Sequence, residues 1–380
     1  MEQLGICVML RNLIHGLSVY NHRENKMPCC GGGSNGPCAC RSGTGDVEGD
    51  SAVGSRMSGP NDPTPEQIFL KGECAPEKCS GCPARGACSS RGADNSTSVA
   101  ISERIQHVGR ILLVLSGKGG VGKSTLATQL AFFLADIMGK YVGLLDLDIC
   151  GPSIPTMTFT KTEQVQNLPT GWEPVSVSHT LQALSVGHLV TQEDAPVILR
   201  GPKKHGMVKQ MLTETNWEFD PRFPKSNIII VDTPPGTSDE HLSIIDMYQS
   251  TIRYMQSNGF PNVPVLEAIV ISTPQEVALA DVRKEINFCK QLNLRIRGVI
   301  ENMSGFVCPF CEAETPVIEA TTGGVKKMCE DMNVPYIGSM PLDPQLMKAG
   351  EDGVAWSTIC DIETSPGYDA FANICGKIIE

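Results

Sequence analysis

Several features are missing from this sequence, and each absence excludes a class of protein. No glycine triplet and no sustained heptad appear, which excludes a collagen-like chain and a coiled coil. No stretch approaches the roughly 18 consecutive apolar residues that span a bilayer. Basic residues are also few, 31 against 42 acidic ones, for a net charge of -11. Because duplex binding depends on basic residues that displace counterions from phosphates, this balance argues against a nucleic-acid partner.

We expect no secretory signal either. Residues 4–20 are the most apolar terminal stretch, but Arg11, Asn12 and His15 interrupt them, and the start Met-Glu-Gln lacks basic residues. Apolar residues recur there at helical spacing. We expect an amphipathic lead-in on a cytoplasmic protein, with contact of residues 4–20 with a membrane surface as the weaker alternative. A start at Met27 would instead make residues 1–26 an unused extension.

Cysteine is present in excess, at 16 of 380 residues. Eight cysteines fall in residues 27–100, where Val, Ile, Leu, Met and Phe together also number only eight. In a reducing compartment such clusters favour metal-bound thiolates over disulfides. Since this segment cannot build an apolar core, we predict a mobile cysteine-rich segment with a metal site at 27–100, between the lead-in at 1–26 and a folded domain at 101–380.

The folded domain has the pattern of an α/β protein. Five short apolar runs are predicted as buried strands: residues 111–115, 141–145, 227–231, 265–271 and 295–300. Helical patterns lie between them, such as residues 124–138 and 275–292. Buried runs that alternate with helices predict a mostly parallel sheet covered by helices on both faces.

A phosphate-binding loop follows the first predicted strand. The pattern requires a glycine, four residues, and then Gly-Lys-Ser, and the chain provides it as Gly117, Lys118, Gly119, Gly120, Val121, Gly122, Lys123, Ser124 and Thr125. Backbone amides and the start of the following helix would face the phosphates of ATP. Lys123 would neutralise the β and γ phosphates, and Ser124 would bind Mg²⁺. A chance glycine-rich turn is the alternative, but strand, loop and helix occur in the required order.

Three aspartates end two of the predicted strands. Asp146 and Asp148 follow the second strand, and Asp232 follows the third. The carboxyl edge of a parallel sheet lies beside the phosphate loop, so we assign Asp232 to the magnesium-bound water, Asp146 to the metal shell and Asp148 to the switch that positions the attacking water. Each one alone could instead be a helix cap.

Four cysteines within fifteen residues predict one metal site, namely Cys74, Cys79, Cys82 and Cys88. Their spacing does not separate a four-thiolate zinc site from an iron-sulfur cluster. A further group, Cys29, Cys30, Cys38 and Cys40, has no role that we can assign.

A late Cys308-Pro-Phe-Cys311 motif provides two more thiolates. A zinc or iron-sulfur site needs four, so either two subunits donate two each, or Cys329 and Cys289 complete the site locally. A thioredoxin-like redox pair is a third interpretation, although that motif normally opens a helix early in its own small fold. Cys150, Cys360 and Cys375 are interpreted as ordinary buried or half-buried thiols.

These motifs together resemble the cytosolic iron-sulfur cluster assembly scaffold ATPases, the Mrp/Nbp branch of the MinD/ParA-like deviant P-loop NTPases. Further stretches similar to that family are Arg200–Lys204, Asp232–Glu240, Thr273–Glu276, Glu301–Phe306 and Thr322–Gly324. The resemblance implies a nucleotide-sandwich dimer in which Lys118 reaches the partner's nucleotide, with Asn302 and Pro341 at the adenine. From local chemistry alone, Asn302 could equally be a turn residue.

The resemblance also implies a [4Fe-4S] cluster shared at Cys308 and Cys311 of a dimer, a second one at the N-terminal cysteines, and slow ATP hydrolysis coupled to assembly or transfer. Its implied partners are a second copy, or a related scaffold ATPase in a heterotetramer, together with cluster-transfer factors and cytosolic and nuclear apo-proteins. The sequence departs from the family where Cys74 precedes Cys79 by only four intervening residues, against about thirteen in the family.

Two other functions share the phosphate loop. A positioning ATPase of the MinD/ParA type would need a C-terminal amphipathic helix or a basic patch, and residues 358–380 offer neither clearly. An ATP-dependent reductase similar to the nitrogenase iron protein would need a stable redox cluster.

Overall fold

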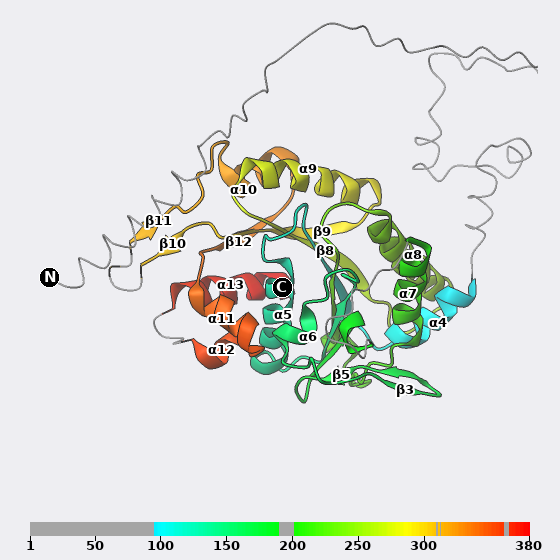
Figure 1. Cartoon of the computed structure of the whole chain (residues 1–380). Coiled ribbons are helices and arrows are strands. Elements are labelled where there is room, and N and C mark those ends of the chain that lie inside the picture. The colour runs from blue at the N-terminus through cyan, green and yellow to red at the C-terminus, as the bar shows by residue number, and fades with distance from the viewer. Residues whose placement is uncertain (1–94, 190–200, 309–310, 312, 361–364) are drawn as a thin grey trace, which may run out of the picture. The chain divides into compact units, whose positions relative to one another are not determined.

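The structure is a computed structural model that describes residues 95–189, 201–308, 311, 313–360 and 365–380 (Figure 1). The predictions for residues 1–26, for Cys29, Cys30, Cys38 and Cys40, and for the metal ligands Cys74, Cys79, Cys82 and Cys88 lie outside these residues. All the structural statements below concern the described part of the chain.

An eight-stranded sheet in the order β12-β9-β8-β1-β7-β2-β6-β5 forms the centre of the domain. The five predicted runs are confirmed as neighbouring parallel strands: β1 (Arg110–Leu115), β2 (Val142–Asp146), β7 (Ile228–Asp232), β8 (Val265–Ser272) and β9 (Arg295–Asn302). Seven of the eight strands pair in parallel, and only the edge strand β5 (Val175–Ser176) runs antiparallel to its neighbour. The predicted fold class is therefore confirmed.

Three strands of this sheet were not predicted from the sequence: the short edge strand β5 named above and two longer strands. The first is β6 (Leu181–Ser185), which pairs with β2, and the second is β12 (Tyr336–Met340), which pairs with β9. Neither has the continuous β-branched run of the central strands. Both lie towards the edges of the sheet, where a strand needs fewer buried apolar residues.

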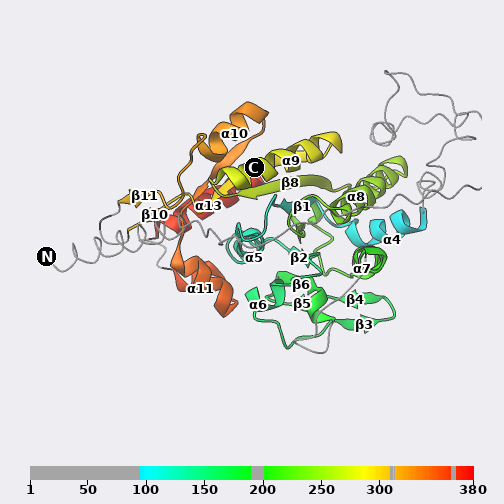
Figure 2. The ribbon, with the colours of Figure 1, turned by 45° about the horizontal axis from the view of Figure 1, so that its top comes forward.

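Helices cover both faces of the sheet (Figures 1 and 2). The two predicted ones are α5 (Lys123–Phe132), which continues as a π-helix over Phe133–Ile137, and α9 (Glu276–Gln291). The other helices are α4 (Asn95–Ile105), α6 (Ile154–Met157), α7 (Gly201–Glu214), α8 (Asp239–Ser257), α10 (Gly324–Met332), α11 (Pro344–Asp352), α12 (Trp356–Ile359) and α13 (Pro366–Ile379).

Each face of the sheet has its own apolar core. In β1, Ile111, Leu113 and Leu115 belong to the core under α4, α7, α8, α9 and α10, whereas Leu112 and Val114 belong to the core under α5, α11, α12 and α13. Successive side chains of a strand point to opposite faces, so a strand buried on both faces must be apolar throughout. This explains why β1 reads as an uninterrupted apolar run.

Two further elements bear on the sequence-based expectations. Helix α4 spans the predicted boundary at residue 101 and packs against α7 and α8. The C-terminal segment, in which we expected no clear amphipathic helix, forms α13 with an apolar side made of Tyr368, Phe371, Ile374 and Ile378. That expectation was wrong, but these side chains are buried in the core beneath the sheet and are not available to a membrane.

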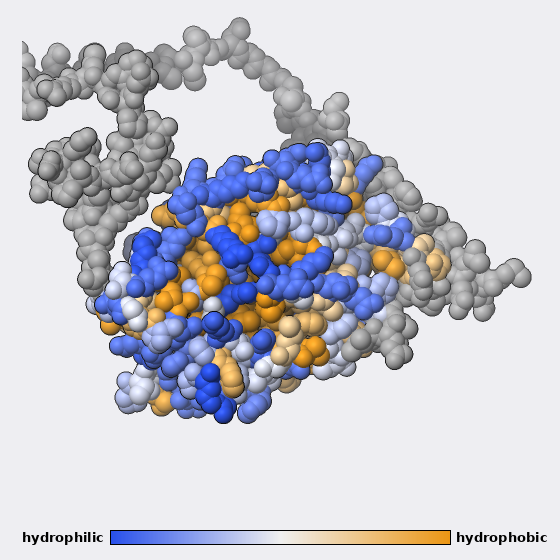
Figure 3. Space-filling view, turned by 180° about the vertical axis from the view of Figure 1, so that it is seen from behind, coloured by the Kyte–Doolittle hydropathy of each residue, from blue (hydrophilic) through white to orange (hydrophobic). Residues whose placement is uncertain are grey.

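Two short hairpins complete the fold, β3 (Gln166–Leu168) with β4 (Gly171–Glu173), and β10 (Phe306–Val307) with β11 (Glu314–Thr315). Among the described residues, no helix combines the length and apolar character of a bilayer span. The face opposite to that of Figure 1 shows apolar side chains in its middle, surrounded and crossed by hydrophilic ones (Figure 3).

Candidate functional site

The phosphate-binding loop joins the end of β1 to the start of α5 at Lys123. Gly120 and Gly122 adopt left-handed conformations, with φ of 80° and 86°, which side chains disfavour. A Cβ atom on Gly122 would also lie 2.3 Å from Nδ2 of Asn302. The glycine pattern thus has the local geometry that a backbone cradle for phosphates requires.

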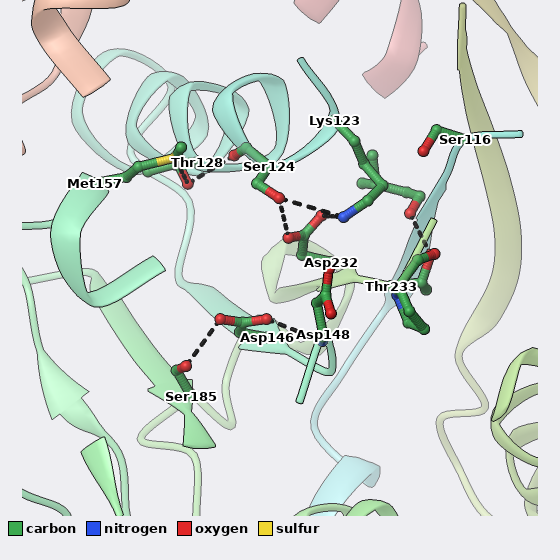
Figure 4. Close-up of polar contacts among 12 residues, drawn as sticks. Ser116, Lys123, Ser124, Thr128, Asp146, Asp148, Met157, Ser185, Asp232 and Thr233 are labelled. Atoms are coloured by element: carbon green, nitrogen blue, oxygen red, sulfur yellow. Dashed lines mark hydrogen bonds and ion pairs between the residues drawn. The ribbon is translucent and has the colours of Figure 1, made fainter. Parts of the chain in front are cut away.

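Lys123, Ser124 and Asp232 form the centre of the site (Figure 4). Nζ of Lys123 lies 2.5 Å from Oδ1 of Asp232, and the Ser124 hydroxyl donates a hydrogen bond of 2.5 Å to Oδ2 of the same carboxylate. Asp232 is fully buried, and this burial raises its pKa, while the charge of Lys123 and both hydrogen bonds oppose the rise. A lysine, a hydroxyl and a carboxylate in contact are the donor set that a magnesium-nucleotide complex needs.

Asp146 lies beside Asp232, because β2 and β7 pair with these two residues in register. Its carboxylate accepts hydrogen bonds from the Ser185 hydroxyl at 2.8 Å and from the backbone amide of Asp148 at 3.0 Å. Burial, followed by the negative charge of Asp232, raises the pKa of Asp146 to about 8. At neutral pH Asp146 therefore carries a proton, which a divalent cation would have to displace.

The structure thus brings together five of the predicted residues: Lys123, Ser124, Asp146, Asp148 and Asp232. Their shared position follows from topology, since β1, β7 and β2 are neighbours and all end at the same edge. Lys118 lies in the same loop with an exposed side chain, and its carbonyl accepts a hydrogen bond from Ser116 at 3.1 Å. Thr125 is half-buried in the first turn of α5.

Asn302 and Pro341 lie at the ends of neighbouring strands, because Asn302 pairs with Met340. The Asn302 side chain is buried and donates from Nδ2 to the carbonyl of Val121 at 2.8 Å. Its Oδ1 accepts from the backbone amide of Met303 at 3.0 Å. Asn302 is therefore bound to the phosphate loop itself, and its contact with adenine stays a prediction.

Two residues near the site escaped the sequence analysis. Ser185, which holds Asp146, lies on the unpredicted strand β6. His241 contacts Pro234 through Nε2 at 3.0 Å, while Nδ1 faces Ser238, the residue that precedes α8. Burial lowers the pKa of His241 to about 4, so the ring is neutral and holds the loop after β7. The spacing of Ser238 and His241, typical of a helix cap, could have indicated this contact.

The cysteine motif connects the two strands of the β10/β11 hairpin. Cys308 is buried, with its amide bonded to the carbonyl of Ala313 at 3.1 Å, whereas Cys311 is exposed. The motif lies between two antiparallel strands and leads into β11 instead of opening a helix, which disfavours the thioredoxin-like interpretation. Within the described part of the chain, no three His, Cys, Asp or Glu side chains are grouped as a metal site.

The two cysteines considered as local ligands to complete this site lie in another part of the domain. Cys289 and Cys329 are buried in the apolar core under α9 and α10, and burial raises the pKa of each thiol to about 12. Metal ligation requires the thiolate, which this environment disfavours. The described structure therefore does not support local completion of the Cys308/Cys311 site. Of the three thiols expected to be buried or half-buried, Cys375 is buried and Cys360 is half-buried, but Cys150 is exposed, so the expectation was wrong for Cys150.

Comparison with known proteins agrees with this site. A family model described as ParA, NUBPL iron-transfer P-loop NTPase, matches residues 107–379, which is most of the chain. The chain belongs to this family. The matched residues include the whole described sheet, the phosphate loop and the late cysteine pair.

Two individual relatives are an iron-sulfur cluster assembly factor and a nucleotide-binding protein. The cytosolic Fe-S cluster assembly factor Nubp1 homolog of Drosophila ananassae is 43% identical over 304 residues, which cover 79% of this chain and 92% of that protein. A nucleotide-binding protein of Archaeoglobus fulgidus, solved in complex with ADP and with cobalt found in it, is 30% identical and covers 70% of this chain and 94% of its own, with a TM-score of 0.54.

Proposed function

We propose that this P-loop ATPase is a scaffold that assembles iron-sulfur clusters and transfers them, with slow ATP hydrolysis, to cytosolic and nuclear apo-proteins. The observation that carries the proposal is the placement of two sites close to the end of one strand. Strand β9 ends at Asn302, which contacts the phosphate loop, and only six residues later the chain reaches Cys308. A nucleotide site and a thiolate pair so close together suit a protein that couples the two chemistries.

In this proposal the cluster is cargo, held by Cys308 and Cys311 of two subunits as a [4Fe-4S] unit. Two thiolates per chain are half of the usual ligand set, and the burial of Cys289 and Cys329 favours a second subunit as the source of the other half. Cys74, Cys79, Cys82 and Cys88 would hold a second cluster. The name of the Drosophila relative, and the cobalt in the archaeal one, support a metal-assembly role.

On the nucleotide side, we assign Lys123 to the phosphates, Ser124 and Asp232 to Mg²⁺ and its water, and Asp146 to the metal shell. Asp148, half-buried at the rim, would orient the attacking water. The amides of Gly117, Gly119, Gly120 and Gly122 would line the cradle. The exposed Lys118 would reach the nucleotide of a second subunit, which requires a dimer.

The oligomeric state that we propose is based on this arrangement. We propose a homodimer, or a heterotetramer with a related scaffold ATPase, acting in the cytoplasm, as the name of the Drosophila relative supports. A membrane-positioning function of the MinD/ParA type is less well supported, because the apolar side of α13 is buried.

A transfer assay tests the proposal. Protein reconstituted anaerobically with iron and sulfide is mixed with an apo four-iron enzyme, and the activity gained by that enzyme is followed with and without ATP. We expect transfer by the wild type, no transfer by Cys311→Ser, and slowed transfer by Lys123→Gln. Cys150→Ser, which also replaces an exposed thiol, is the matched control. A wild-type protein that binds zinc, stays colourless and activates nothing would refute the proposal.

A further inference from the structure

Two sequence motifs have no role in the nucleotide site described above, Thr273–Glu276 and Thr322–Gly324. Both lie close to the segment that carries the cysteines. This segment, residues 303–321, leaves the sheet after β9 and returns at α10, and we call it the cysteine excursion. Its two ends are fixed by contacts of different kinds.

The first end is fixed to the phosphate loop. The Asn302 side chain contacts the carbonyl of Val121 at 2.8 Å and the amide of Met303 at 3.0 Å, so it joins the loop backbone to the first residue of the excursion. Met303 has a φ of 58°, a conformation that non-glycine residues rarely adopt. Such a conformation persists only where the surroundings hold it, which is what the Asn302 amide does.

The second end is fixed to helix α9. The Thr322 hydroxyl donates a hydrogen bond to Glu276 at the start of α9, and the other oxygen of Glu276 forms an ion pair with Arg283 at 2.6 Å. Figures 1 and 2 both show α9 and α10 side by side. The carboxylate of Glu301, next to Asn302, accepts a hydrogen bond from the amide of Val325 in the first turn of α10.

Helix α9 also contacts the phosphate loop. A Cβ atom on Gly117 would lie 2.7 Å from the backbone carbon of Asp281, so the first residue of the loop packs directly against this helix. The phosphate loop is thus in contact with the supports of both ends of the cysteine excursion. One path of contacts runs from Val121 through Asn302 to Met303. The other runs from Gly117 through α9 and Glu276 to Thr322.

We propose that Asn302 and the Glu276–Thr322 pair are positioning residues that make the geometry of Cys308 and Cys311 depend on the occupancy of the phosphate loop. This rests on the proposed scaffold function and adds the residues through which nucleotide and cluster communicate. Neither path needs a direct contact between nucleotide and cluster. By linkage, the cluster must change nucleotide affinity by the same factor by which nucleotide changes cluster affinity.

The experiment measures this factor. The affinity of the full chain for a fluorescent ADP analogue is titrated anaerobically on metal-free and on cluster-loaded protein, and the ratio of the two dissociation constants is the coupling. The variants are Asn302→Asp, which cannot donate to Val121, and Thr322→Val, which lacks the hydroxyl. Thr321→Val is the matched control, since the neighbouring threonine is also exposed and no described residue bonds its hydroxyl. A guanine analogue is titrated in parallel to detect an adenine contact of Asn302.

We expect a wild-type ratio of about 5-fold or more, a typical allosteric coupling, preserved in Thr321→Val. The ratio should fall towards one in Asn302→Asp and decrease in Thr322→Val, with iron content maintained. Because Thr322 is exposed, its variant should fold even if the Asn302 variant does not.

Other outcomes overturn the inference in distinguishable ways. A wild-type ratio in both variants, or a lost preference for adenine with unchanged coupling in Asn302→Asp, would show that these residues do not couple the sites. A wild-type protein that carries iron without any coupling would refute the inference alone. A wild-type protein that takes up no iron would refute the proposed function and, with it, the inference.

Discussion

The nucleotide site and the cysteine excursion are built in opposite ways. The nucleotide site lies at the ends of central strands, and its side chains are buried and paired with one another, as Lys123 is with Asp232. The excursion rests on a two-stranded hairpin, and its Cys311 is exposed. The core therefore brings the buried residues of the first site together within one chain, and only Lys118 is proposed to act across a dimer, whereas the second site offers only half of a ligand set. The contrast indicates that one chain can bind nucleotide, while holding a cluster at Cys308 and Cys311 should require two.

The contrast predicts that the two functions are separable. Lys123→Gln should lower the rate of ATP hydrolysis by about 10²–10³-fold, since it removes a preorganised charge from the phosphates, and should leave the iron content unchanged. Cys311→Ser should lose the iron of the shared site, retain the iron bound by the N-terminal cysteines, and retain nucleotide binding. Steady-state phosphate release and iron analysis of both variants check this. A common loss of both functions in either variant would show that neither site forms without the other, which goes beyond the coupling of affinities proposed above.

The pH dependence of Mg²⁺ binding sharpens the description of the nucleotide site. Because the pKa of Asp146 is raised to about 8, Mg²⁺ must displace a proton at neutral pH. The Mg²⁺ affinity of the nucleotide complex should therefore rise by up to about tenfold per pH unit below pH 8 and level off above it. Calorimetric titration between pH 6.5 and 9 measures this, with Asp148→Asn as a rim control. If the slope persists in Asp146→Asn, the assignment of the proton to Asp146 is wrong.

A third prediction concerns a buried carboxyl outside both sites. Glu285 in α9 is fully buried, neither oxygen has a hydrogen-bond partner among the described residues, and burial raises its pKa to about 7. The folded state then binds more protons than the unfolded state between about pH 4.3 and pH 7, so stability falls as pH rises through this window. We expect a loss of about 3 kcal/mol across it, since each pH unit contributes about 1.4 kcal/mol.

Glu285→Gln should remove this part of the pH dependence. Urea unfolding at pH 5 and pH 7.5 measures the difference in free energy for wild type and variant. Because other groups also titrate in this range, the quantity that decides is the change between the two proteins. An identical pH dependence in both would place the titrating group elsewhere.

The sequence allowed the nucleotide site to be predicted because that site depends on strong local signals. Strands such as β7 read as continuous apolar runs, and Asp232 follows directly at the strand end. The residues that hydrogen-bond to these side chains were harder to predict from the sequence. Ser185 lies on β6, whose short alternating run is a weak signal, so its contact with Asp146 becomes visible only through the pairing of β6 with β2.

The cysteine region was predictable in chemistry but not in geometry. Spacing predicted a metal site at Cys308 and Cys311, yet no local pattern shows that Cys289 and Cys329 are buried away from it, because this depends on how α9 and α10 pack. The helix α13 was missed for a related reason. Gly367 and Gly376 lower its helix propensity, and packing of its apolar side on the core compensates.

The central claim, that two chains share a cluster at Cys308 and Cys311, is tested most directly by Mössbauer spectroscopy with iron and sulfide counts on the reconstituted protein. The Cys79→Ala/Cys82→Ala double variant removes the contribution of the N-terminal cysteines. The account predicts a [4Fe-4S] spectrum, about four irons per two chains, and a dimer by sedimentation, all lost in Cys308→Ala. Iron bound stoichiometrically to a monomer, or zinc in place of iron, would contradict it.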